Sequence, residues 1–310
     1  MLYGKLDRLR DRAGDRLAEV LASPGGSDQA MSERDTFAAD LSRRIVQIDA
    51  AEHGLCFGRL DLAGDERRYV GRLGIVDDEG DYDQLLVDWR APAARPFYVA
   101  TAVAPEGVRR RRHIRTRLRA VVGVDDEVLD RHSPDAVRTG GPAGEAALLA
   151  ALEAVRTGRM SDIVETIQAE QDQVIRSPQA GVLVVQGGAG TGKTAVALHR
   201  VAYLLYTHRE QLARRGVLVV GPNATFLRYI GQVLPSLGET GVVLADVGGL
   251  FPGVTADRAE PPAVAEVKGR PEWAGVLAAA VRDRQQVPDG GLDLVVDDGP
   301  VRLDARTCRR

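Results

Sequence analysis

The sequence contains few cysteines and no long apolar run. The two cysteines in 310 residues, Cys56 and Cys308, lie far apart and lack the spacing of metal ligands. Neither a disulfide framework nor a zinc site is therefore indicated, and a reducing compartment is expected. No apolar run approaches the ~20 residues that span a bilayer, and the charged N-terminus does not resemble a signal peptide. We expect a cytoplasmic protein that makes no membrane contact.

Lysine is also scarce, with three lysines against 38 arginines. Abundant Ala, Gly and Arg indicate a codon composition that accounts for much of this bias. One of the three, Lys193, lies inside a glycine-rich loop, which favours a functional role for that loop. The net charge of -3 excludes no class of partner.

The first 55 residues carry two amphipathic patterns. Apolar residues recur at spacings of three and four from Leu2 to Val20, and a second stripe runs from Phe37 to Leu55. With "SPGGS" between them, these patterns predict an antiparallel helical hairpin over 1–55. The pattern leaves open whether the hairpin packs onto its own domain or projects as an arm.

The next segments change from helical to alternating patterns. Residues 56–133 consist of short apolar runs separated by Gly and Asp turns, which predicts a small antiparallel β module with one strand in "ARPFYVATAV" (94–103). Residues 134–160 predict a linker and a connecting helix. In 161–252, "GVLVV" (181–185) and two later apolar runs alternate with helical patterns. This βαβαβ order predicts an α/β fold with a parallel sheet.

A phosphate-binding pattern follows the predicted strand 181–185. It matches G-x-x-x-x-G-K-[ST], and its residues are Gly187, Gly188, Ala189, Gly190, Thr191, Gly192, Lys193 and Thr194. Glycines let the backbone wrap around a phosphate, and the following helix N-terminus attracts the anion. Lys193 would contact the β- and γ-phosphates and the Thr194 hydroxyl would bind Mg²⁺. We therefore predict a nucleotide site in which Lys193 and Thr194 also serve catalysis.

Two other interpretations of this loop are weaker. A dinucleotide site needs an acidic residue near the end of the next strand, which instead ends in "VVGPN". A simple glycine turn is disfavoured by the strand and helix patterns on either side. Gln171, sixteen residues before Gly187, adds specificity, because an amide both donates to and accepts from the N6/N7 edge of adenine. A lone Gln on a polar helix is usually only solvated.

These segments resemble known families. "IQAEQDQVI", "VQGGAGTGKTAVALHRVAYLL" and "VLVVGPNATFLRYIGQVLPSLGE" resemble the Gln motif, Walker A and motif Ia of superfamily-1 UvrD/Rep-type helicases. "YVGRLGIVD" and "LLVDWRAPAARPFYVAT" resemble the N-terminal part of HelD-type proteins, bacterial ATPases that bind RNA polymerase and help detach it from nucleic acid.

The resemblance runs to about residue 287 and implies a role for each segment. Residues 1–55 would be an arm that enters the polymerase secondary channel, and 161–252 the first part of a RecA-like ATPase domain. Residues 253–310 would begin an inserted subdomain. Gln171 would recognise the adenine of ATP. Trp89 and Arg90, in "DWRAP", are expected to be structural.

An arginine-rich strand is a second candidate interface. Strand alternation places His113, Arg115, Arg117 and Arg119 on one face, which could contact DNA, RNA or an acidic polymerase surface. The alternative is a solvated strand balanced by the acidic residues 125–127.

Hydrolysis requires more than this loop. A carboxylate must hold Mg²⁺, and the Asp-Glu-Ala-Gln-type segment of the family is absent. Asp246 follows motif Ia, and Asp297 and Asp298 precede a Gly-Pro typical of a hairpin turn. Only 116 residues follow Thr194, too few for a second RecA-like domain of ~150 residues.

We therefore expect an incomplete RecA-like domain in a truncated fragment that binds ATP and Mg²⁺ weakly without turnover. A non-enzymatic RNA polymerase-binding factor is the alternative function. A UvrD-like DNA helicase is disfavoured by the missing second motor domain and by the extra arm.

Overall fold

The chain divides into two units, residues 1–252 and residues 253–310. The computed structural model describes residues 1–23, 27–78, 80, 82–130, 162–237, 239, 241–251, 253, 256, 258–285, 290–296 and 299–308. The predicted linker and helix at 134–160 lie outside these residues.

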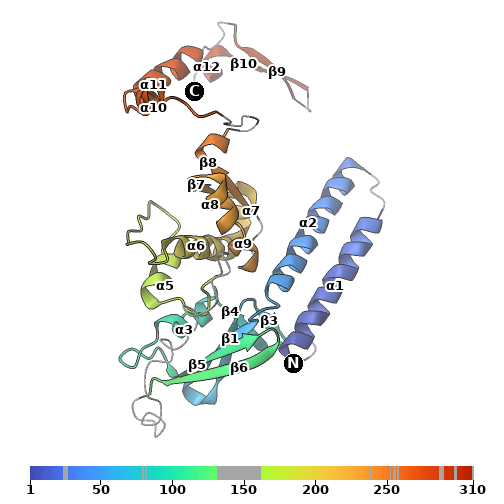
Figure 1. The fold of residues 1–310 in the computed structure, drawn as a ribbon. Coiled ribbons are helices and arrows are strands. Elements are labelled where there is room, and N and C mark those ends of the chain that lie inside the picture. Colours follow the sequence, from blue (N-terminus) through green and yellow to red (C-terminus); the bar gives the residue numbers. More distant parts are fainter. Residues whose placement is uncertain are drawn as a thin grey trace. The chain divides into compact units, whose positions relative to one another are not determined.

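The N-terminal helical hairpin predicted from the sequence is confirmed (Figure 1). It consists of α1 (Leu2–Ala22) and α2 (Asp28–Ala50). The Ser27 hydroxyl caps α2 by accepting a hydrogen bond from the Ala30 amide. Only the root of the pair is buried, around Leu6 and Ile48, whereas Phe37 of the predicted stripe is 64% exposed. The hairpin is therefore anchored at one end and solvated along most of its length.

The β module forms a six-stranded sheet in the order β3-β4-β2-β1-β5-β6. The strands are β1 (Cys56–Leu62), β2 (Arg67–Gly71), β3 (Ile75–Val76), β4 (Gln84–Asp88), β5 (Val108–Arg117) and β6 (Ala120–Val128), with a short 3-10 turn η1 (Ala63–Asp65) after β1. Neighbours run antiparallel except β2 and β4, which are parallel. The predicted antiparallel module is confirmed apart from this pair.

The prediction of a strand at 94–103 was wrong. The segment contains the 3-10 turn η2 (Pro92–Ala94) and the helix α3 (Pro96–Val99), and both start with proline. Proline lacks the N–H that a sheet ladder needs, and its fixed φ suits the first position of a helix. The two prolines therefore turn an apolar run into helical turns.

The segment from residue 162 to 251 contains the predicted alternation of helices and strands in part. Its elements are α5 (Ala169–Ile175), α6 (Lys193–Thr207), α7 (Arg209–Arg215), β7 (Val217–Gly221), α8 (Ala224–Ile230), α9 (Val233–Ser236), β8 (Val242–Asp246) and the turn η4 (Val247–Gly249). Strands β7 and β8 pair in parallel, as expected for a strand–helix–strand connection.

The buried strand predicted at 181–185 is not formed. Residues 182–188 have no regular secondary structure, and Val182 is 93% exposed. An apolar strand becomes buried only when partner strands flank it and helices cover it. Within the described residues, β7 and β8 pair only with each other, so no partner is available to this run.

One hydrophobic core joins the β module to the helices that follow the phosphate-binding pattern. It includes Phe57, Trp89 and Phe97 from the module and Leu198 and Leu227 from α6 and α8. The Trp89 ring packs edge-on against His199 of α6, with 5.6 Å between ring centroids. A second core joins the hairpin root to the opposite part of the sheet. The described residues between 1 and 251 thus form one packed body.

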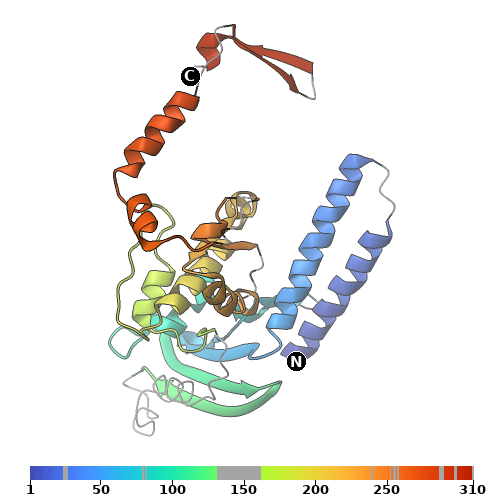
Figure 2. The same cartoon turned by 45° about the horizontal axis from the view of Figure 1, so that its top comes forward.

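Among the described residues of the second unit, whose elements are drawn in Figure 2, none is buried. It contains α10 (Pro262–Lys268), α11 (Trp273–Arg284), the antiparallel pair β9 (Leu292–Val296) and β10 (Gly299–Leu303), and α12 (Ala305–Cys308). This pairing confirms the hairpin expected around the Gly-Pro. Asp297 and Asp298 lie outside the described residues. None of the helices in the described ranges has the length and apolarity needed to cross a membrane.

Candidate phosphate-binding site

The loop from Gly187 to Gly192 adopts a conformation that only glycines allow without strain. Gly190 and Gly192 have φ of 78° and 83°, in the left-handed region. A Cβ on Gly187 would lie 2.6 Å from the Thr191 hydroxyl, which itself donates to the Gly188 carbonyl at 3.0 Å. The glycine spacing read from the sequence therefore has a conformational reason.

Lys193 and Thr194 stand at the start of α6, directly after the loop. The Lys193 amine donates to the carbonyls of Gly187, at 2.8 Å, and Gly188. The cation thus lies over the loop that would hold the phosphates. The first N–H groups of a helix have no partner within the helix and favour an anion. Loop, lysine and helix N-terminus together fit a polyphosphate.

Fewer groups at this site are suited to bind Mg²⁺ than to bind phosphate. Thr194, in the first turn of α6, is the one hydroxyl that the sequence assigned to Mg²⁺. No group of three His, Cys, Asp or Glu side chains suited to a metal occurs among the described residues. Asp246 accepts a hydrogen bond from the Gly249 amide at 2.9 Å and so caps a turn. Thr194 therefore stays the magnesium ligand predicted from the sequence, and a bound polyphosphate would have to supply others.

Gln171 lies beside the loop, although sixteen residues separate it from Gly187 in sequence. Its Oε1 accepts a hydrogen bond from the Gln168 amide at 3.0 Å, as part of the capping box of α5. Its Nε2 lies 3.2 Å from the position that a Cβ on Gly192 would occupy. The structure thus brings the predicted base-recognition and phosphate-binding residues together.

Arg200 holds α5 against α6, a role that the sequence did not reveal. Its guanidinium donates to the carbonyls of Val174, Ile175, Ser177 and Pro178 at 2.7–3.2 Å. These carbonyls lie at and beyond the end of α5, where the helix itself leaves acceptors without a full set of partners. A sequence pattern cannot identify them as partners, because they lie 22 or more residues before Arg200.

Arg176 links α5 to the β module. It pairs with the buried Asp172 one helical turn earlier, at 2.7 Å, and donates to the carbonyls of Trp89 and Arg90 at 2.8 Å. The i, i+4 spacing of Asp172 and Arg176 was a visible signal for the pair. The contacts of Arg176 with the carbonyls of residues 89 and 90 had no such signal in the sequence.

Arg90 is buried in a second ionic cluster. It forms a two-pronged ion pair with Asp88, donates to Glu239 at 2.6 Å, and stacks over Tyr206 with 4.8 Å to the ring centroid. Burial raises the pKa of the Glu239 carboxyl, and the charge of Arg90 opposes this shift. Trp89 and Arg90 therefore have the structural role that was expected of them.

Comparison with known proteins identifies both parts of this body. Residues 1–139 match the family described as DNA helicase IV HelD, N-terminal domain, and residues 167–221 match the UvrD/REP helicase N-terminal domain. Residues 1–139 and 167–221 are therefore similar to the N-terminal domains of HelD-type and UvrD/Rep-type helicases, respectively. ATP-dependent DNA helicase PcrA from two strains of Staphylococcus epidermidis is 44% identical over 46 residues, which cover 15% of this chain and 6% of each relative.

Within the HelD-type domain, the arginine-rich strand is engaged mainly in internal ion pairs. Arg111, Arg112 and Arg115 pair with the acidic residues 125–127 of the neighbouring strand at 2.5–3.1 Å. Arg117 has no such partner in the described part of the chain.

The four residues 113, 115, 117 and 119 do not share one exposed face. His113 is buried against Phe97, with 4.9 Å between ring centroids. Strand β5 ends at Arg117, and Leu118 has a φ of 54°, which directs Arg119 away from the strand. The strand alternation assumed from the sequence therefore ends at Arg117, two residues before Arg119.

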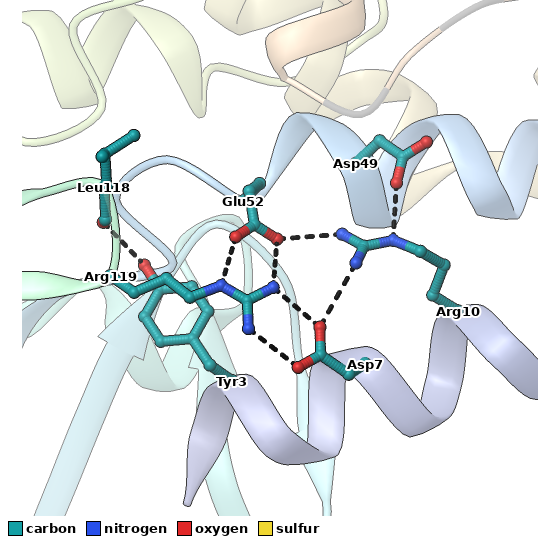
Figure 3. Close-up of polar contacts among 7 residues, drawn as sticks. All are labelled: Tyr3, Asp7, Arg10, Asp49, Glu52, Leu118 and Arg119. Atoms are coloured by element: carbon teal, nitrogen blue, oxygen red, sulfur yellow. Dashed lines mark hydrogen bonds and ion pairs between the residues drawn. The ribbon is translucent and has the colours of Figure 1, made fainter.

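Arg119 instead fixes the hairpin root to the sheet (Figure 3). Its guanidinium donates to both carboxylate oxygens of Asp7, at 2.7 and 2.8 Å, and to Glu52. Arg10 extends the cluster to Asp49, at 2.7 Å, and to Glu52, at 2.9 Å. We call these five side chains the root cluster. They join the start of α1, the end of α2 and the turn between β5 and β6.

Proposed function

We propose that the chain binds ATP at the Gly187–Thr194 loop, with Gln171 at the adenine and Thr194 on Mg²⁺, as part of a HelD-type motor that uses ATP to release RNA polymerase from nucleic acid. The observation that carries this proposal is the juxtaposition of the Gln171 amide, the glycine loop and Lys193 at the N-terminus of α6. The HelD and UvrD/Rep domain matches support it.

The shared core gives the proposal a mechanical basis. Lys193 and Thr194 start α6, and six residues after Lys193 the same helix contacts Trp89 of the β module through His199. The root cluster then connects the module to the hairpin that would enter the polymerase. A change at the phosphates could therefore reach the hairpin through packed elements, without a flexible link.

Nucleotide binding is the first test. A fluorescent ATP analogue titrated into the full chain should bind, and Lys193→Ala should weaken binding by at least tenfold, because the phosphates lose their cation. Excess GTP should compete less well than ATP, and Gln171→Ala should reduce this preference. Equal binding by the parent and Lys193→Ala would refute a nucleotide site in this loop.

A non-enzymatic RNA polymerase-binding factor is the second candidate. It is favoured by the exposed run 182–185, which does not form the strand predicted for the ATPase domain. Capture of RNA polymerase by the full chain should then be unchanged by Lys193→Ala and by nucleotide. ATP turnover by the parent that Lys193→Ala abolishes would exclude this candidate.

A further inference from the structure

A cavity of about 280 Å³ lies between the hairpin, the β module and α6–α7, away from the Gly187–Thr194 loop. Four arginines line it: Arg44 from α2, Arg72 after β2, Arg90 after β4 and Arg209 at the start of α7. Asp88 is the one carboxylate among its lining residues. A cavity lined by four guanidinium groups and one carboxylate is a candidate anion site.

Two of these arginines are already neutralised. Arg90 is paired with Asp88 and Glu239, and Arg72 lies 2.8 Å from Asp162 and 3.5 Å from Glu165. Asp88 also accepts a hydrogen bond from the Arg90 amide, so its oxygens are engaged. The single lining carboxylate therefore has little capacity left for a second cation.

Arg44 and Arg209 differ from the other two. Neither has a carboxylate within ion-pairing distance in the described part of the chain. Burial and the nearby charges of Arg209 and Arg90 lower the pKa of the Arg44 guanidinium, and the attraction of Asp88 only partly offsets them. Arginine remains protonated near neutral pH, so two like charges face each other at this cavity.

We propose that this cavity binds a small phosphate-bearing anion through Arg44 and Arg209. A guanidinium presents paired N–H donors in a plane that matches two phosphate oxygens, and an anion between two such groups removes their repulsion. The volume corresponds to roughly nine water molecules at about 30 Å³ each, which suits a phosphate or pyrophosphate group.

A neighbouring cavity of about 730 Å³ shares Arg44, Gln47 and Arg209 with the first. Its lining includes Leu205 and Leu212 and also three carboxylates, those of Asp40, Glu210 and Glu239. It would therefore suit an uncharged or cationic remainder of a larger phosphorylated molecule, not further phosphates. The site is independent of the Gly187–Thr194 loop, because none of the loop residues lines either cavity.

The experiment uses the full chain carrying Lys193→Ala, so that the loop does not contribute. Inorganic pyrophosphate is titrated by calorimetry at constant ionic strength, and ATP is titrated in a second arm. Saturable binding is expected, with about tenfold weaker affinity in Arg44→Gln and about 100-fold weaker affinity in Arg44→Gln/Arg209→Gln. Arg16→Gln, which removes an exposed charge from α1, is the matched control and should bind like the parent.

Thermal unfolding gives a second readout that does not depend on calorimetry. Pyrophosphate should raise the melting temperature of the Lys193→Ala chain and of its Arg16→Gln control, but not that of the double variant. Binding by pyrophosphate but not ATP would identify a free anion, and binding by both would identify a phosphate group of a larger molecule. Absent binding, equal binding by the double variant, or an equal shift with chloride at the same ionic strength would overturn the proposal.

Discussion

At the scale of single residues, His113 shows how burial determines the protonation state of a side chain. It lies in β5 between Phe97 and the strand β6, and its Nε2 is buried without a hydrogen-bond partner among the described residues. Burial, and to a smaller extent the charge of Arg111, lower the pKa of the imidazole to about 4. The ring is therefore neutral in the folded protein under conditions in which the unfolded chain would be half protonated.

This difference predicts how acid affects stability. Between pH 6.5 and 4 the unfolded state binds more protons at this position, so the free energy of unfolding falls as the pH is lowered. His113→Leu should reduce this loss by up to about 3 kcal/mol, which is the order expected for a shift of ~2.5 pKa units. Urea unfolding of the parent and of His113→Leu at pH 7 and pH 4.5 measures this loss of unfolding free energy. The exposed His53, replaced by Leu, is the control, and an unchanged slope in His113→Leu would contradict the assignment.

At the scale of elements, the orientation of the hairpin depends on a few side chains at its root. The helices are solvated along most of their length, and Leu6 and Ile48 anchor them in the second core. Arg119 adds four ionic hydrogen bonds, two to Asp7 of α1 and two to Glu52 just after α2. Arg119 lies in the turn between β5 and β6, and its hydrogen bonds reach both helices of the hairpin. These bonds restrict rotation of the hairpin about its apolar anchor.

Removal of Arg119 should therefore loosen the hairpin without unfolding it. In Arg119→Gln, amide hydrogen exchange should accelerate at residues 2–10 and 48–55 and remain unchanged in β1 and β2. High salt should have the same effect on the parent, because exposed ion pairs are screened. Arg16→Gln, whose partner Glu19 lies on the same helix, should leave exchange at the root unchanged. Equal exchange in Arg119→Gln and the parent would show that the apolar anchor suffices.

At the scale of the whole molecule, the HelD-type domain and the start of the helicase domain share one core. Trp89, Arg90 and Arg176 connect segments that are 87 to 149 residues apart in sequence. Residues 1–252 should consequently unfold in one transition, and a cut between the two domain matches should destabilise both.

The Arg90 cluster provides the test of this coupling. Arg90→Ala leaves Asp88 and Glu239 buried without their cation, which should cost about 3–5 kcal/mol in the free energy of unfolding. The loss should appear equally in signals from Trp89 and from α6. Arg43→Ala, which breaks an exposed pair with Asp40, should cost less than about 1 kcal/mol. Two separate transitions in Arg90→Ala would show that the domains fold independently.

Local patterns were sufficient for much of the fold. The two amphipathic stripes, the alternating runs of the β module and the strands β7 and β8 were predictable, because neighbours three, four or two residues apart decide which face is apolar. The strand at 94–103 failed because Pro92, just before it, and Pro96, within it, start helical turns that outweighed its hydrophobicity. The strand at 181–185 failed because its pattern requires partner strands, and a pattern cannot supply them.

By itself, the sequence determined the conformation of the Gly187–Thr194 loop, because this depends on eight consecutive residues and on the conformational freedom of glycine. Only the tertiary structure decided the roles of the remote residues: Arg119 holds the hairpin, Arg200 holds α5, and Arg44 and Arg209 line one cavity without carboxylate partners among the residues that the structure describes. Each of these arginine side chains is long and charged, and nothing in the sequence indicates which residue it contacts. Its partner is set by which distant backbone or side chain the fold brings within a few ångströms, and that depends on the packing of the whole chain.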